Sequence, residues 1–114
     1  MINGSCLCGL VTYQADCDNG PIIHCHCQTC RKAHSAAFAS VMPIAPAAFK
    51  WTSGEDQLNS FESSPGKNRY FCANCGSQLI AERREAKLSL LRLGCVDSEI
   101  SERPDSHSWR SDDA

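Results

Sequence analysis

Cysteine is the residue type that most restricts what this chain can fold into. Its 114 residues include 9 cysteines, against 8 leucines, 6 isoleucines, 3 valines and 4 phenylalanines to fill a core. So few large apolar residues are typical of disorder, but disorder also needs a high net charge, and the formal charge here is only −2. We therefore expect one small domain stabilised through cysteine, and neither a multidomain protein nor a strongly cationic nucleic-acid binder.

Cysteines cross-link a chain through disulfides or through metal, and the sequence favours metal. The first positive charge is Arg31, so no basic cluster with a following apolar run indicates a secretory signal. We expect the reducing cytoplasm, where thiols stay free or bind metal, and an odd number of cysteines also fits disulfides poorly. The longest uncharged mid-chain stretch, residues 33–49, is too short for a membrane span and contains two prolines, so no membrane partner is expected.

The apolar pattern predicts a mainly β domain of short strands. Runs of β-branched and aromatic residues alternate with turn residues, and one segment, 28–34, is long enough for one or two helical turns. The expected strands cover 10–15, 21–24, 37–42 (ended by Pro43), 49–51, 58–62, 69–72, 78–82 and 88–95. We expect a single domain over residues 1–114, loose from about residue 98, where the chain turns polar.

Seven of the nine cysteines fall into three tight groups. These groups are Cys6-x-Cys8-Gly9, Cys25-His26-Cys27-x-x-Cys30 and Cys72-x-x-Cys75-Gly76. A Cys-x-x-Cys spacing lets both sulfurs reach one ion at about 2.3 Å while backbone N–H groups point at the sulfurs. A glycine after the second cysteine supplies the positive φ that closes such a turn. A glycine-closed pair together with a distant Cys-x-Cys indicates a metal site.

Seven thiolates divide into a set of four and a set of three. A closed four-sulfur site is structural, whereas three protein ligands with an open position are typical of catalytic zinc. The middle group is the natural three-ligand set, and the two glycine-closed pairs would close a long loop. The predicted structural set is Cys6, Cys8, Cys72 and Cys75, and the predicted open set is Cys25, Cys27 and Cys30.

Two other interpretations of the middle group remain open. His24 or His26 could complete a closed structural site, although both directly adjoin Cys25, which leaves little freedom to face the same ion. The group could also hold no metal and consist only of reactive thiols.

These motifs resemble a known family. The resemblance rests on Gly4-Ser5-Cys6-Leu7-Cys8-Gly9, His26-Cys27-x-x-Cys30-Arg31 and Phe71-Cys72-x-x-Cys75-Gly76-Ser77. Weaker matches are Phe49-x-Trp51-x-x-Gly54-Glu55 and Gly94-Cys95-Val96-Asp97. Together they resemble the glutathione-dependent formaldehyde-activating enzyme family, which includes the centromere-protein-V group, from about Asn3 to Trp109. The resemblance implies a β-tent of short twisted antiparallel sheets and two zinc ions, divided between the cysteines as above. It also implies condensation of formaldehyde with glutathione to S-(hydroxymethyl)glutathione, a carbon–sulfur lyase activity.

The chemistry of the open set agrees with that implication. Zinc on three thiolates carries a net charge of about −1 and is a weaker Lewis acid than zinc on histidines, so it suits activation of another thiolate. An incoming thiol would lose its proton and attack an aldehyde carbon, giving a hemithioacetal. We therefore predict that Cys25, Cys27 and Cys30 are the catalytic residues, with a small thiol and an aldehyde as partners.

Several side chains near these motifs are weaker candidates. Arg31, Lys32 and Arg69 could pair with a substrate carboxylate, although solvated charges are an equal interpretation of the first two. His34 could shuttle a proton, or could be a surface residue or a hydrogen-bond donor behind the ligands.

The two tryptophans and the two isolated cysteines are expected to be structural. Trp51 and Trp109 should pack in the core or at its edge. Cys17 should be an exposed thiol, and Cys95 a small buried apolar residue at a strand end.

Two functions of other classes stay open. A non-catalytic zinc module could bind protein, whereas nucleic acid is disfavoured because the positive charges are scattered. A thiol redox sensor would form a disulfide within the middle group and release metal.

Overall fold

Two β-sheets and one short α-helix make up the part of the chain that the computed structural model describes, residues 1–16, 21–98 and 106–108. The strands are β1 (Ile2–Ser5), β2 (Thr12–Ala15), β3 (Ile23–Cys25), β4 (Ala39–Ile44), β5 (Phe49–Ser53), β6 (Leu58–Ser64), β7 (Lys67–Cys72), β8 (Gln78–Arg83), β9 (Leu88–Arg92) and β10 (Ser106–Ser108), and the helix is α1 (Gln28–His34). Strands β1, β2 and β5 form a three-stranded sheet, and the other seven have the order β10-β3-β4-β9-β8-β7-β6. The predicted mainly β fold of short antiparallel strands is confirmed.

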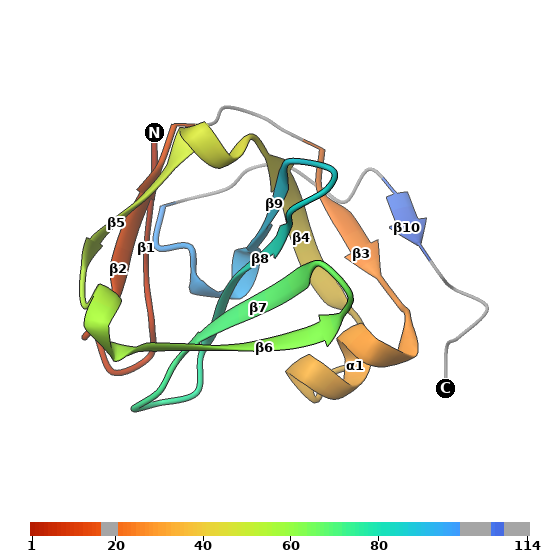
Figure 1. Cartoon of the computed structure of the whole chain (residues 1–114), viewed down its shortest axis with the longest axis horizontal. Helices are drawn as coiled ribbons and strands as arrows, with labels where there is room; N and C mark the ends of the chain where they lie inside the picture. Colours follow the sequence, from red (N-terminus) through yellow and green to blue (C-terminus); the bar gives the residue numbers. More distant parts are fainter. Residues whose placement is uncertain (17–20, 99–105, 109–114) are drawn as a thin grey trace.

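The smaller sheet and the helix lie at opposite ends of the molecule. Figure 1 shows β1, β2 and β5 on the left, β3 and β10 on the right, and α1 below β3 and β4. Every strand pairing is antiparallel except that of β10 with β3, which is parallel. Three 3₁₀ turns, Pro46–Ala48, Glu55–Gln57 and Leu93–Cys95, connect or follow strands.

The seven-stranded sheet separates a large core from a small one. The large core contains the buried residues Ile2, Cys6, Val11, Tyr13, Ala15, Ile22, Met42, Ile44, Cys72, Leu79, Ile80 and Leu91, and the small core contains Cys30, Ala39 and Val41. Alternation along β4 explains the division, because Ala39 and Val41 point to one face and Met42 and Ile44 to the other. Cysteine thus occupies buried positions in both cores, as the shortage of aliphatic residues suggested.

Strand β1 was not expected from the sequence. Its residue Gly4 is buried, and the ring of Tyr13 from the neighbouring strand β2 packs directly over it. Any larger residue at position 4 would collide with that ring. Because this strand contributes a single large apolar side chain, Ile2, its apolar pattern is too weak to identify it.

Several expected strand boundaries differ from the structure by two or three residues. Strand β4 does not end at Pro43 but continues to Ile44, with Pro43 opposite Leu90 of β9. Strand β3 pairs with β4 only as far as Val41, so at Pro43 one side of the strand has no neighbour and a missing N–H is tolerated. Strand β9 ends at Arg92 rather than at residue 95, because the chain turns into a 3₁₀ helix there, and β7 begins at Lys67, two residues before the expected start.

The tail contains structure where a loose chain was expected. Ser106–Ser108 forms β10, which pairs in parallel with β3. Trp51 packs as expected, edge-on to Phe49 and Tyr13 with ring centroids 4.7 and 6.3 Å away. Cys17 and Trp109 lie outside the described residues. No described helix is both long and apolar enough to cross a membrane.

Candidate metal centres and active site

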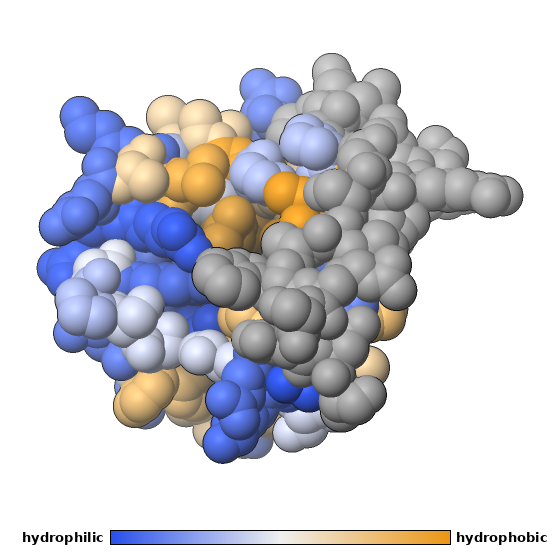
Figure 2. Space-filling view, turned by 90° about the vertical axis from the view of Figure 1, so that its right-hand side faces the viewer, coloured by the Kyte–Doolittle hydropathy of each residue, from blue (hydrophilic) through white to orange (hydrophobic). Residues whose placement is uncertain are grey.

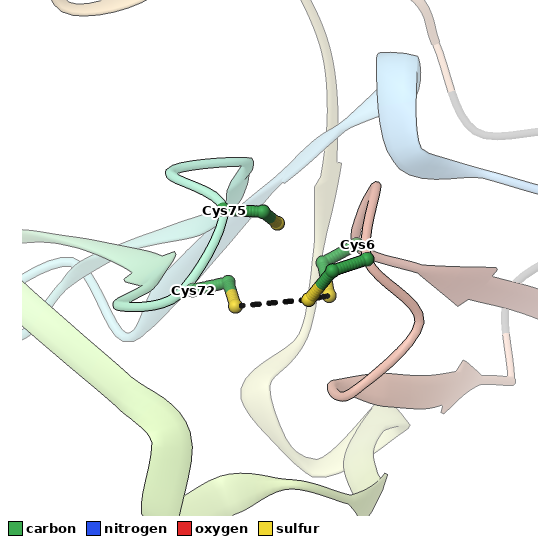
Figure 3. Close-up of side chains that lie close together, drawn as sticks. Cys6, Cys72 and Cys75 are labelled. Carbon is green, nitrogen blue, oxygen red and sulfur yellow. Dashed lines mark hydrogen bonds between the residues drawn. The ribbon is translucent and has the colours of Figure 1, made fainter.

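The four cysteines of the predicted structural set come together at the junction of the two sheets. Cys6 and Cys8 lie in the β1–β2 turn, and Cys72 and Cys75 lie at the end of β7 and in the turn that follows. All four sulfurs lie within 4.8 Å of one another. Figure 3 shows Cys72 and Cys75 pointing toward Cys6 from a different part of the chain. The site therefore joins a hairpin of the small sheet to a hairpin of the large one.

Glycines and backbone hydrogen bonds shape both turns. Gly9 and Gly76 have φ of 82° and 80°, and their N–H groups donate to the carbonyls of Cys6 and Cys72 at 3.0 and 2.7 Å. The Val11 N–H donates to the Cys6 sulfur at 3.3 Å. These are the positive φ and the N–H···S contact that the motif predicted.

The geometry and charge of this set fit a tetrahedral metal. The sulfur of Cys8 lies 3.5 Å from that of Cys6 and 3.8 Å from that of Cys72, close to the roughly 3.8 Å between sulfurs around a tetrahedral zinc. A hydrogen bond with the Ser77 hydroxyl, 3.3 Å from the sulfur, is the main cause that lowers the pKa of Cys75 to about 5. The Asn74 side chain likewise lowers the pKa of Cys8. The Cys75 backbone acts to lower the pKa of Cys72, but burial and the Cys75 and Cys6 thiols raise it to about 11. Two of the four thiols are thus acidified, as the thiolates that bind a metal must be.

The middle cysteines form a second group around the start of α1. Cys25 ends β3, Cys27 caps the helix by accepting a hydrogen bond from the Cys30 N–H at 3.3 Å, and Cys30 is buried in the first turn. Their three sulfurs also lie within 4.8 Å of one another. A single ion could therefore bind all three.

Neither neighbouring histidine belongs to this group within the described part of the chain. His24 pairs with Ser40 and so points to the face of the sheet opposite Cys25. Both imidazoles lie against Phe38, with ring centroids 4.2 Å away for His24 and 5.2 Å for His26. Among the described histidines, cysteines and acidic residues, the cluster stops at three, which is the arrangement of an open site.

Buried cations surround the three cysteines. The Arg69 guanidinium lies 3.6 Å from the Cys30 sulfur and donates through Nε to the Ser63 hydroxyl at 2.8 Å. Lys67, Arg69 and Arg92 are only 9%, 3% and 3% exposed. Positive charge of this kind stabilises thiolates, and with it a negatively charged metal–thiolate group.

The two thiols at the start of the helix differ in acidity. Burial raises the pKa of Cys27 to about 11. Burial also acts to raise the pKa of Cys30, but the hydrogen bond from Arg69 leads the opposing effects that bring it down to about 7. Cys30 is therefore the thiol of the pair that ionises first.

Strand register explains why these cations gather. Opposite residues of neighbouring strands share a face, and Cys25 lies opposite Ala39 while Val41, two residues further along β4, lies opposite Arg92. On β7, alternation sends Lys67 and Arg69 to this same face and Cys72 to the other. One face of the sheet thus carries the three-cysteine group, and the other carries part of the four-cysteine group.

A cavity of about 520 Å³ borders the small core. Its lining residues are Ala33, His34, Ser35, Ala36, Phe38, Ala39, Ser40, Gly76, Ser77, Gln78, Arg92 and Gly94. Ala39 also packs with Cys30 in the small core, whereas Ser77 contacts Cys75 of the four-cysteine group. A second cavity, of about 360 Å³, meets the three-cysteine group directly and is lined by Cys27, Gln28, Thr29, Ser63, Ser64, Lys67, Arg69 and Arg83. Burial, with Arg92 as the largest charged influence, lowers the pKa of His34 to about 4, so this imidazole is neutral at neutral pH. Figure 2, a view of the side on which β10 lies, shows a small area of hydrophobic atoms bordered by hydrophilic ones.

The structure separates the predicted substrate residues. Arg69 reaches Cys30. Arg31 and Lys32 instead line a shallow hollow of about 390 Å³ on α1, and none of the three cysteines lines it. Cys95 lies half-buried against the large core, in a 3₁₀ turn rather than at a strand end, and its thiol donates to the Gln78 carbonyl at 3.4 Å.

Sequence reasoning missed Lys67, Gln78 and Arg92. A weak signal existed for two of them. Lys67 stands two residues before Arg69 in a strand, and Arg92 ends an apolar run, where a charge is either exposed or functional. Nothing in the local sequence marks Gln78.

Comparisons with known proteins identify the relatives of this chain. An uncharacterised lyase of Schizosaccharomyces pombe is 32% identical over 76 residues, which are 67% of this chain and 53% of that protein. This chain thus spans about half the length of that relative. A crystal structure of a Rhodobacter sphaeroides protein has the same fold, with a TM-score of 0.77 at 18% identity, covering 93% of this chain and 99% of that one.

The family itself is shown by a match over almost the whole sequence. The family model described as glutathione-dependent formaldehyde-activating enzyme matches residues 1–112. All three cysteine groups lie within that match, and both clusters that they form are described above. The chain therefore belongs to the glutathione-dependent formaldehyde-activating enzyme family.

Proposed function

We propose that this protein catalyses the reversible addition of a thiol, such as glutathione, to formaldehyde or another small aldehyde, as a carbon–sulfur lyase. The observation that carries the proposal is a group of three sulfurs without a fourth ligand among the described residues, with buried cations around it and a cavity of about 360 Å³ that Cys27 helps to line. Family membership and the name of the yeast relative support a lyase in general terms.

We propose zinc at both cysteine groups, two ions per chain. Cys6, Cys8, Cys72 and Cys75 would hold the structural ion, and Cys25, Cys27 and Cys30 the other. An ion bound by the three thiolates would supply an open coordination position at which a thiol is acidified.

The chain's own residues account for the rest of the reaction. Arg69 holds Cys30 as a thiolate and fixes its orientation. The neutral His34 has an Nε2 with no hydrogen-bond partner among the described residues, so it can take the thiol proton. As the new C–S bond forms, the carbonyl π electrons move to the oxygen, and this oxygen takes a proton to become the hydroxyl of the hemithioacetal.

The test is an exchange measurement with a metal count. Because thiols and formaldehyde combine rapidly without a catalyst, we would measure by NMR the exchange between free and thiol-bound formaldehyde, above the uncatalysed rate, for a panel of thiols. We expect two zinc ions in the wild type, one in Cys27→Ser with activity lost, and two in the control Cys95→Ser with activity kept. Full activity and two ions in both Cys27→Ser and Cys30→Ser would refute the proposal.

One observation favours a second function, a thiol redox sensor. The Cys30 thiol has a lowered pKa, and its sulfur lies within 4.8 Å of those of Cys25 and Cys27. The Cys30 thiolate could therefore be oxidised and then captured by a neighbouring thiol as a disulfide. Mild peroxide would then form a disulfide within Cys25, Cys27 and Cys30 and release one ion. Mass spectrometry of alkylated peptides distinguishes this outcome from catalysis.

A further inference from the structure

Arg92 is a buried cation whose guanidinium has no hydrogen-bond partner among the described residues. Its side chain is 3% exposed, and none of Nε, Nη1 and Nη2 meets an acceptor among the described residues. Leaving a buried charge without such bonds is costly, so these groups usually pair with a counter-charge or a ligand. Burial lowers the pKa of Arg92 only to about 10, so the side chain remains charged at neutral pH.

Neutralising the thiolates does not by itself explain Arg92. The Arg69 guanidinium contacts Cys30 at 3.6 Å. The Arg92 nitrogens make no such contact with a sulfur, although the thiolates of Cys30, Cys25 and Cys27 favour its charged form. Arg92 instead lines the cavity of about 520 Å³ that borders the small core.

The rest of the cavity is suited to an anion. No aspartate or glutamate is among its described lining residues, so Arg92 meets no competing carboxylate there. The side-chain oxygen of Gln78 is buried and also lacks a partner among the described residues. Because an amide's oxygen and nitrogen can exchange places by a flip, Gln78 can present an N–H donor to the same cavity that Arg92 lines.

The distance from the sulfurs limits what this anion can belong to. Cys25 and Arg92 lie on one face of the sheet with β4 between them, so their strands are roughly 10 Å apart. A molecule that reaches both must carry its anionic group several bonds from its sulfur. The apolar Ala39, between the two, would lie along the connecting atoms.

We propose that Arg92, assisted by Gln78, binds a carboxylate of the thiol substrate and so selects thiols with a carboxylate remote from the sulfur. The inference rests on the proposed thiol chemistry for the identity of its ligand. The planar guanidinium can hold a carboxylate through two parallel hydrogen bonds, and the surrounding burial strengthens them. Arg92 is thereby a specificity-determining residue.

Calorimetric binding to the zinc-loaded protein tests this without catalysis. The probes are S-methylglutathione, whose blocked sulfur cannot react, and its diethyl ester, which lacks both carboxylates. We expect the wild type to prefer the acid, and Arg92→Gln to bind the acid at least about tenfold more weakly with that preference lost. The matched control Arg84→Gln removes an exposed arginine that pairs with Glu62 at 3.0 Å, and it should bind as the wild type does.

A second variant covers the case in which Arg92→Gln does not fold. Should Arg92→Gln fail to give a folded circular dichroism spectrum, Arg92→Lys preserves the charge but not the two parallel bonds, and it should also weaken acid binding. Equal binding of acid and ester by the wild type, or an unchanged preference in a folded Arg92 variant, would overturn the inference. Acid-selective binding without aldehyde exchange would instead refute the proposed function and leave the carboxylate site in place.

Discussion

The two cysteine groups are built from the same residue type but have different surroundings. The four-cysteine group joins two hairpins of different sheets, and two of its members, Cys6 and Cys72, belong to the large hydrophobic core. The three-cysteine group lies on the other face of the large sheet, where Cys30 belongs to a core of only three buried residues. Buried cations adjoin the second group, and Cys27 lines a cavity together with two of them, Lys67 and Arg69.

This difference suits the four-cysteine group to stabilising the fold and the three-cysteine group to binding a substrate. A metal at the first group would add a cross-link between two sheets to the apolar contacts that Cys6 and Cys72 already make in the large core. A metal at the second group would lie beside charged and partnerless side chains, which stabilise little but can bind and orient a substrate. The following predictions test that separation, beginning with the largest effect.

Cys72→Ser should abolish the folded state. Cys72 is fully buried, so the substitution removes a sulfur ligand and leaves a hydroxyl in the large core. We expect no cooperative thermal transition by circular dichroism, whereas Cys27→Ser should retain one. A cooperative transition close to the wild type in Cys72→Ser would show that the two groups do not differ in this way.

Chelation should remove the two metal ions in separate steps. The three-cysteine group has an open position and two half-buried sulfurs, so its ion should leave first and the circular dichroism spectrum should stay folded. The second ion should leave only with unfolding. The measurement is a titration with a zinc-chelating dye, read by absorbance and circular dichroism together, and a single step of simultaneous loss would contradict the separation.

Arg69→Gln should change the acidity of the three-cysteine group alone. In protein from which the ion proposed for the three-cysteine group has been removed, the wild-type Cys30 thiol has a pKa of about 7 and is about half ionised at pH 7. Without the Arg69 cation its pKa should rise, so alkylation by iodoacetamide at pH 7 should slow several-fold, since only the thiolate reacts. The difference should vanish well above pH 9, where both proteins are ionised.

The control for this change is Arg84→Gln, an exposed position on the turn after β8. It removes the same charge from the molecule as a whole but no contact with sulfur. An equal slowing of alkylation in Arg84→Gln would mean that net charge, rather than the Arg69 contact, sets the reactivity of Cys30.

Gly76→Ala should have the smallest effect. A Cβ at Gly76 meets no other atom within 4 Å, but the φ of 80° is strained for alanine, at a cost of about 1 kcal/mol. The comparison is Gly94→Ala, which also has open space but no positive φ and should be nearly neutral. Chemical denaturation measures both, and equal stabilities of the two variants would remove the role assigned to this turn.

The division of the cysteines could be read without a structure, because it depends on local spacing. Two sulfurs two or three residues apart can reach one ion whatever the rest of the chain does, so Cys25, Cys27 and Cys30 had to be neighbours. The glycines after Cys8 and Cys75 are equally local, and both have the positive φ expected of them. The mainly β fold followed from the short apolar runs in the same way.

The surroundings of the three-cysteine group could not be read from the sequence, because they depend on strand register. Arg31 and Lys32 are adjacent to Cys30 in sequence, but they line a hollow on the helix that none of the three cysteines lines. Arg92 is 62 positions beyond Cys30 and shares its face of the sheet because β9 lies beside β4. Register sets which side chains share a face, and a shift by one residue would have reversed it.

The sequence by itself thus determined which cysteines group together, the strand-rich fold and the family. Only the tertiary structure decided that the four-cysteine group joins two sheets, and that Lys67, Arg69 and Arg92 converge near the other three. The physical reason is range: ligand spacing and turn chemistry act over a few residues. Charge and cavity arise where strands distant in the sequence pair, and that pairing reflects the packing of the whole chain.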